Sequence, residues 1–162
     1  MLIVLGSNIE PEVNIPASVA QLAHHPDMAL MATSATYVTP AVGADGQPSG
    51  QAAFHNAAAM IQTDLAPAAI VRSLRAIEHN LGRVRNGDKF APRPIDLDIA
   101  LIEDRIIDFD GRHIPDPDVV RFPHLAVPLA DIAAEWLHPE TGITLGQIAQ
   151  PFNNKESELK KL

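Results

Sequence analysis

The chain contains no cysteine, which excludes disulfide bonds and thiolate metal sites and is compatible with a reducing compartment. Aromatic residues make up only 4% of the chain, and they do not alternate with basic residues as they do on RNA-binding sheets. No apolar run approaches the roughly 18 residues of a membrane span, and the apolar start reads as a first strand, not a signal peptide. We therefore expect a cytoplasmic protein without a nucleic-acid or membrane partner.

The standard nucleotide-binding signatures are also missing: the chain has neither a Walker A pattern nor a dinucleotide glycine fingerprint. What remains is an apolar content of 46% over 162 residues, enough to fill one core of normal size. We assign residues 1–152 to a single domain, which we expect to be a monomer. Residues 153–162 read as a polar, partly disordered tail.

Hydrophobic periodicity and turn signals predict the order β-α-β-β-α-β, which is that of a ferredoxin-like α+β sandwich. Further elements after residue 104, a turn rich in proline and aspartate and then a helix, would be C-terminal additions to this sandwich. A loop of about a dozen residues between the second and third strands suggests a lid or a binding loop. The expected strands are 2–5, 28–38, 54–63 and 95–101, and the expected helices are 11–25, 67–81 and 127–136.

Positive charge is concentrated in one segment of an otherwise acidic chain. The chain carries a formal charge of -8, yet residues 72–93 hold six basic and two acidic side chains and are therefore +4. Arg83, Arg85 and Arg93 lie in a loop rich in glycine, asparagine and proline, where helix ion pairs do not explain them. Guanidinium groups bind phosphate oxygens in bidentate fashion. Arg75 and Glu78 share a helix flank and could either pair with each other or reach a ligand.

Directly after this segment, Asp96 and Asp98 alternate with Ile95, Leu97 and Ile99. Period-2 geometry puts the apolar set, which also includes the following leucine at 101, on one face and both aspartates on the other, with Cα atoms about 6.5 to 7 Å apart. Two such anions repel unless a cation lies between them. A strand face exposed to water is the alternative, but arginines followed by an aspartate pair favour a polyphosphate with its Mg²⁺.

Several motifs in this order resemble those of the 6-hydroxymethyl-7,8-dihydropterin pyrophosphokinases of folate biosynthesis. The resemblance covers nearly the whole chain. The motifs run from Leu5-Gly6-Ser7-Asn8 through Tyr37-Val38-Thr39-Pro40, Phe54-His55-Asn56-Ala57-Ala58, Ile77-Glu78 and Leu81-Gly82-Arg83-Val84-Arg85 to Ala91-Pro92-Arg93-Pro94-Ile95-Asp96-Leu97-Asp98-Ile99 and Val127-Pro128-Leu129.

This resemblance implies transfer of diphosphate from ATP to the hydroxymethyl group of 6-hydroxymethyl-7,8-dihydropterin, with release of AMP. It implies that Asp96 and Asp98 bind two Mg²⁺ ions and that Arg83 and Arg93 are catalytic. It implies nucleotide contacts at Glu78, Arg85 and Ile99, to which we add the basic residues Arg75, Lys89, Arg112 and Arg121 as candidate ATP ligands. The pterin pocket would comprise Thr39, Pro40, Val42, Phe54 and Asn56, with His124 as a further member.

The segment 112–124 departs from the family pattern. Asp116 stands where the family often has histidine, and Arg121-Phe122 comes one place early. His124 falls where a phenylalanine is expected; an imidazole can still stack on a ring but is smaller and can become charged. Two rival functions remain at this stage. The fold also serves binding modules, and the same aspartate pair could serve a metal-dependent phosphodiesterase.

Overall fold

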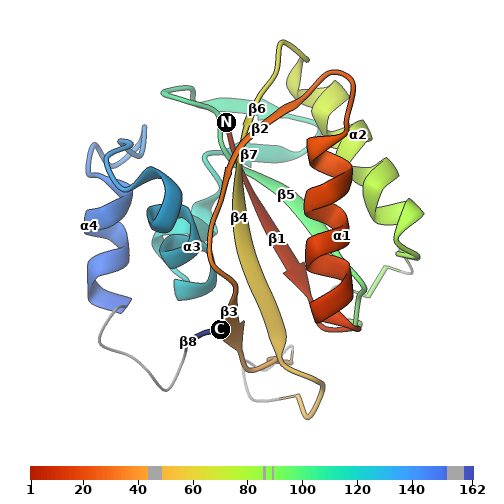
Figure 1. The fold of residues 1–162 in the computed structure, drawn as a ribbon. Helices are drawn as coiled ribbons and strands as arrows, with labels where there is room; N and C mark the ends of the chain where they lie inside the picture. The colour runs from red at the N-terminus through yellow and green to blue at the C-terminus, as the bar shows by residue number, and fades with distance from the viewer. Residues whose placement is uncertain (44–48, 86, 89, 153–158) are drawn as a thin grey trace.

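A computed structural model describes residues 1–43, 49–85, 87–88, 90–152 and 159–162. Within them, one antiparallel sheet has the strand order β5-β1-β4-β3-β8, and β2 also pairs with β4 (Figure 1). A separate hairpin joins β6 to β7. The strands are β1 (Leu2–Ser7), β2 (Ala29–Thr33), β3 (Tyr37–Thr39), β4 (Phe54–Gln62), β5 (Asp96–Leu101), β6 (Ile107–Phe109), β7 (Arg112–Ile114) and β8 (Lys160–Lys161).

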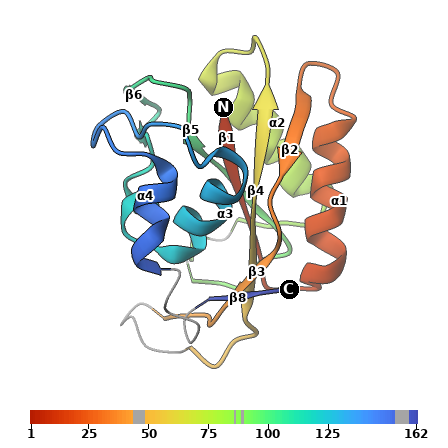
Figure 2. The same cartoon turned by 60° about the vertical axis from the view of Figure 1, so that its left-hand side comes forward.

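Helices cover both faces of the sheet, so the expected ferredoxin-like sandwich carries an additional helical layer (Figures 1 and 2). One face is covered by α1 (Pro11–Ala23) and α2 (Pro67–Asn80), and the other by α3 (Pro123–Ala133) and α4 (Leu145–Ala149). Short 3-10 turns, η1 (Pro117–Val120) and η2 (Gln150–Phe152), precede α3 and follow α4. The predicted α+β class is confirmed, and so is the order β-α-β-β-α-β, in which the second strand is divided into β2 and β3. Each face of the sheet has its own apolar core.

One packing prediction for β5 is wrong. The sequence pattern places Leu101 on the same face as Ile99, but Leu101 packs with Ala100 and Leu2 in the core under α3 and α4. The reason is an irregular register: Leu2 pairs with Leu101, whereas the next residue, Ile3, pairs with Ile99. A bulge of this kind inserts one residue and turns the following side chain to the other face. The two aspartates precede the bulge and keep the predicted alternation.

Three element boundaries also differ from the predictions. The strand expected over 28–38 is two strands, separated where the Ser34 hydroxyl accepts a hydrogen bond from the Ala58 amide at 2.8 Å. The helix expected over 127–136 begins earlier, because Pro123 suits a first helical position. The tail was not expected to contain a strand, yet β8 lies within it. Among the described residues, no helix has the length and apolar character needed to cross a bilayer.

Candidate active site

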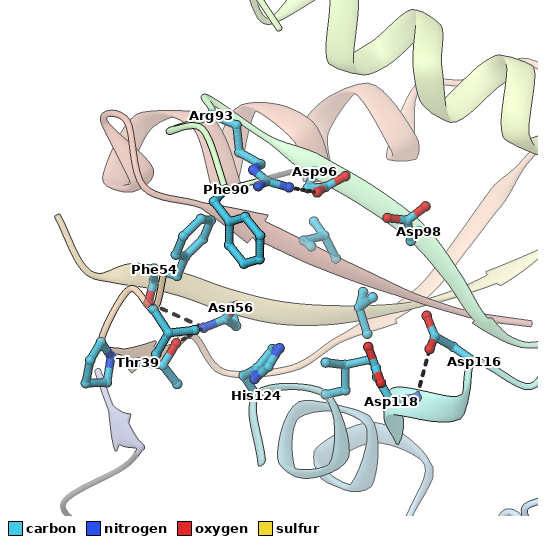
Figure 3. A pocket seen from close by; sticks show the side chains of 16 residues that line it. Thr39, Phe54, Asn56, Phe90, Arg93, Asp96, Asp98, Asp116, Asp118 and His124 are labelled. Atoms are coloured by element: carbon cyan, nitrogen blue, oxygen red, sulfur yellow. Dashed lines mark hydrogen bonds and ion pairs between the residues drawn. The ribbon is translucent and has the colours of Figure 1, made fainter. Parts of the chain in front are cut away.

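Asp96 and Asp98 project from β5 toward the same open region of the molecule (Figure 3). Two cavities, of about 450 and 610 Å³, meet there. Both are lined by the two aspartates together with Arg93 and Asp118. The face of β5 that carries the aspartates therefore opens onto a pair of adjoining cavities. This arrangement differs from the alternative of a strand face that merely contacts water.

A network of ion pairs connects Asp96 to α2. Arg83 Nη1 contacts both Asp96 Oδ1 and Glu78 Oε1, the latter at 2.6 Å. Arg93 Nη1 lies 2.6 Å from Asp96 Oδ2, and Arg85 Nη2 lies 2.7 Å from Glu78 Oε2. Burial alone would raise the pKa of Asp96, but the two arginines outweigh it and lower that pKa. Asp96 is therefore held as a carboxylate.

Asp98 has the opposite electrostatic environment. Burial and then the nearby negative charge of Asp96 raise the pKa of Asp98 to about 6, although Arg112 opposes the shift. Arg112 Nη1 donates to Asp98 Oδ1 at 2.9 Å. Two neighbouring carboxylates whose pKa values move apart are characteristic of functional sites. The pair therefore has the charge density that attracts a cation.

Every residue that the sequence predicts for the pterin pocket lines the smaller cavity. Figure 3 shows Phe54 on one side of this cavity and His124 on another, with Asn56 between them. Burial lowers the pKa of His124, so its ring is neutral near pH 7. The members are Thr39, Pro40, Val42, Phe54, Asn56 and His124.

Two asparagines fix the geometry of this region. The Asn56 amide nitrogen donates to Thr39 Oγ1 at 3.0 Å, which orients the amide within the cavity. Asn8 Oδ1 accepts from the Arg93 amide at 2.8 Å, while the Asn8 amide donates to the Arg93 carbonyl at 3.2 Å. Arg93 also lies over the Phe54 ring, 5.6 Å from its centroid. Arg93 thus links Asp96 to the aromatic wall of the smaller cavity.

Only some of the residues that the sequence predicts for ATP binding lie at the two cavities. Arg85 lines the larger cavity with Arg83, and Arg112 contacts Asp98. Glu78 is buried, with 2% of its side chain exposed, and accepts from the Leu97 amide, so it supports the site from beneath. Its ion partners are Arg83 and Arg85, so the alternative of a helical pair with Arg75 is wrong.

Three other ATP candidates lie outside the two described cavities. Arg75 is exposed on α2, and Arg121 is largely exposed, 3.8 Å from Asp118. Ile99 is 3% exposed and packs in the core, so its side chain does not reach either cavity. Lys89 lies outside the described residues.

Sequence reasoning missed several residues that line the cavities. Phe90 faces the smaller cavity and its carbonyl accepts from the Gln51 side chain at 3.0 Å; an aromatic residue in a loop rich in glycine and proline was the available signal. Asp116 and Asp118 also line this cavity. The Asp116 carboxylate caps η1 by accepting from the Asp118 amide at 2.9 Å, which gives the departure from histidine a structural role.

The donor set of the site fits a hard divalent cation. Asp96 and Asp98 offer carboxylate oxygens, the ligand type that Mg²⁺ prefers, and Mg²⁺ commonly takes one or two carboxylates and fills its remaining positions with water and substrate phosphates. No cluster of three or more potential metal ligands occurs in the part of the chain that the structure describes. The arrangement therefore suits an ion shared with a substrate better than one enclosed by protein.

Sequence comparisons place the chain among known proteins. Residues 2–134 match the family model described as 7,8-dihydro-6-hydroxymethylpterin-pyrophosphokinase. A curated relative from Haemophilus influenzae, named 2-amino-4-hydroxy-6-hydroxymethyldihydropteridine pyrophosphokinase, is 31% identical over 97% of this chain and 96% of its own length. A relative of the same name from Synechocystis sp. is 33% identical over 90% of this chain and 72% of its own length.

Structural comparisons agree on the fold. A crystal structure of Plasmodium falciparum HPPK-DHPS with pteroate aligns with a TM-score of 0.72 over 96% of this chain, at 12% identity. A structure of HPPK-DHPS in complex with substrates aligns with a TM-score of 0.74 over 99% of this chain, at 11% identity. The chain spans less than half of those two chains, 44% and 46% respectively. At such identities the likeness concerns the fold alone.

Proposed function

The chain belongs to the 7,8-dihydro-6-hydroxymethylpterin-pyrophosphokinase family, and we infer that it is a pyrophosphokinase of folate biosynthesis acting on a hydroxymethyldihydropterin. We propose that ATP is the donor, that the diphosphate passes to the hydroxymethyl group of 6-hydroxymethyl-7,8-dihydropterin, and that AMP is released. The acceptor oxygen bonds to the β-phosphorus and loses its proton to solvent, while the bond between the β-phosphorus and the α,β-bridging oxygen breaks, so that this oxygen leaves with AMP. The curated relatives from Haemophilus influenzae and Synechocystis sp. carry a name that describes this acceptor.

The observation that carries this proposal is the meeting of two cavities at one aspartate pair. The smaller cavity has the composition of a pterin site, because an aromatic ring can cover the face of a flat heterocycle and an amide can bond its donor and acceptor edge. The larger cavity is lined by arginines suited to phosphate. A donor and an acceptor bound in the two cavities would present their reacting atoms near Asp96 and Asp98.

Charge supports a requirement for Mg²⁺. The described residues that line the two cavities include five carboxylates but only three guanidinium groups. ATP, itself an anion, would enter a negative environment unless divalent cations accompanied it. The carboxylates are Asp88, Asp96, Asp98, Asp116 and Asp118, and the guanidinium groups are Arg83, Arg85 and Arg93. We propose two ions bound through Asp96 and Asp98.

Bound Mg²⁺ would supply positive charge to the phosphate oxygens and would lower the pKa of the acceptor hydroxyl. The side chains of the protein supply alignment and charge. Arg83 and Arg93 now neutralise Asp96, and we propose that they turn to the phosphates once cations satisfy that carboxylate. Two guanidinium groups beside the transferred diphosphate stabilise the charge that develops on it. Asn56 and Phe54 orient the acceptor.

The experiment that tests this function identifies the nucleotide product. The purified protein is incubated with ATP, Mg²⁺ and 6-hydroxymethyl-7,8-dihydropterin, and AMP and ADP are quantified with and without the pterin. We expect AMP that appears only with the pterin, and no AMP when a chelator removes the metal. ADP as the product would contradict diphosphate transfer. AMP formed equally without the pterin would favour the phosphodiesterase alternative.

A cytoplasmic location, a monomeric state and the lack of nucleic-acid or membrane partners stay predictions.

A further inference from the structure

The last residues of the chain form an edge strand beside a wall of the smaller cavity. Lys160 and Lys161 of β8 pair antiparallel with Val38 and Tyr37 of β3, and the Leu162 amide donates to the Thr36 carbonyl at 3.0 Å. Figure 2 shows β8 running alongside β3. Because β3 is only three residues long and pairs with β4 on its other edge, β8 completes its backbone pairing.

A side-chain cluster fastens this edge to α3. Asp131 of α3 accepts a hydrogen bond from the Ala35 amide at 3.1 Å, and its Oδ2 lies 3.7 Å from Lys161 Nζ. The same Nζ lies 5.6 Å from the centroid of the Tyr37 ring. Burial, and then the Asp131 carboxylate, raise the pKa of Tyr37 to about 12. We call Asp131, Tyr37 and Lys161, with the β8 backbone, the edge cluster.

The edge cluster holds two walls of the smaller cavity without lining it. β3 contributes Thr39, and the Asn56 amide donates to Thr39 Oγ1 at 3.0 Å and to the Tyr37 carbonyl at 3.4 Å. α3 begins beside the same cavity, where it contributes His124. The exposed ion pair between Lys161 and Asp131 adds little stability by itself. The edge cluster instead fixes the position of β3 relative to α3, because it joins the two elements at a point away from the cavity.

We propose that the edge cluster positions the pterin site of this enzyme, with Asp131 and β8 as positioning elements that set the placement of Thr39, Asn56 and His124. This inference rests on the proposed function. The proposed ATP site is formed by Glu78 of α2 and by residues of the larger cavity, among them Arg83, Arg85 and Asp98. The hydrogen bond, the ion pair and the strand pairing of the edge cluster involve none of these residues. Loosening the edge cluster therefore raises the KM for the pterin and leaves the KM for ATP unchanged.

The test uses Asp131→Asn, removal of residues 160–162, and Lys160→Ala as the matched control, because alternation along β8 turns the Lys160 side chain to the face opposite Lys161. We expect the KM for the pterin to rise about ten-fold on removal of β8 and about three-fold for Asp131→Asn, with the KM for ATP and kcat within about two-fold. Lys160→Ala behaves as wild type.

Tyr37 gives a readout that does not depend on activity, because it is the only tyrosine in the chain. Tyrosinate absorbance should titrate near pH 12 in the folded wild type and at lower pH in Asp131→Asn. A raised folded-state pKa favours the neutral phenol, so this group contributes stability below pH 10 that is lost between pH 10 and 12.

A shifted Tyr37 titration with an unchanged KM for the pterin would overturn the inference. A parallel rise of both KM values would do so too, because it indicates general destabilisation. Wild-type protein without pterin-dependent AMP formation would instead refute the proposed function, so the two failures are distinguishable.

Discussion

Replacing Asp98 with asparagine is expected to lower kcat/KM by about 10³-fold or more while leaving the folded protein at least as stable as the wild type. The activity falls because a neutral amide is a far weaker Mg²⁺ ligand than a carboxylate. Stability is preserved because burial and the charge of Asp96 raise the pKa of Asp98 to about 6, which means that the fold disfavours the charged form. Steady-state kinetics and urea denaturation at pH 7 measure the two quantities.

The matched control is Asp118→Asn, because Asp118 lines the same two cavities but lies on η1 rather than on β5. Its loss removes negative charge near the proposed phosphate site, so the KM for ATP should stay constant or fall. Calorimetric titration with Mg²⁺ and a nonhydrolysable ATP analogue adds a readout independent of turnover. If the Asp98→Asn variant kept the wild-type kcat/KM at limiting Mg²⁺, Asp98 would not be an Mg²⁺ ligand.

Replacing Glu78 with alanine is expected to destabilise the protein by about 3 kcal/mol, because it breaks a buried ionic network from one side. Glu78 Oε1 accepts from both Arg83 and the Leu97 amide, and Oε2 accepts from Arg85. Truncation leaves a buried amide without its acceptor. It also leaves the Arg83 guanidinium group, 10% exposed, with the Asp96 carboxylate and the Ile95 carbonyl as its remaining acceptors. The free energy of unfolding from urea denaturation measures the loss.

Glu135→Ala is the control for this variant, because Glu135 is exposed and its loss should change the free energy of unfolding by less than about 0.5 kcal/mol. The free energy of unfolding of Glu78→Gln should lie between those of Glu78→Ala and Glu135→Ala. The amide oxygen of glutamine can still accept from the Leu97 amide, but it no longer forms ion pairs. If Glu78→Ala were as stable as Glu135→Ala, the network would not support the site. Glu78 would then be a candidate for direct nucleotide contact, as the family resemblance implies.

The sequence predicted the structure best where the residue repeat of a single strand or helix decides which way a side chain points. The alternation around Asp96 and Asp98 needs only two-residue geometry, and both carboxylates lie on the predicted face of β5. Leu101 deviates because a bulge depends on how β1 pairs with β5, which no local pattern encodes. The hydrophobic periodicity that predicted a helix over 67–81 is local in the same way, and Ile70 and Leu74 are buried on one face of α2.

Long-range placement accounts for what the sequence did not predict. From the sequence, Glu78 could either pair with Arg75 or reach a ligand, but tertiary packing buries it against Arg83 and Arg85 of the following loop. The strand at Lys160 and Lys161 has no β propensity of its own and forms because β3 offers an unpaired edge. Asp116 and Asp118 join the cavity only through the turn that leads into α3.

The most direct test of diphosphate transfer follows the β-phosphorus of ATP. ATP labelled at the β-phosphorus is incubated with the enzyme, Mg²⁺ and 6-hydroxymethyl-7,8-dihydropterin, and the pterin product is separated from the nucleotides. We predict that the pterin carries the β-label together with the γ-phosphate and that the AMP formed is unlabelled. Label retained in ADP, with only the γ-phosphate on the pterin, would contradict the account.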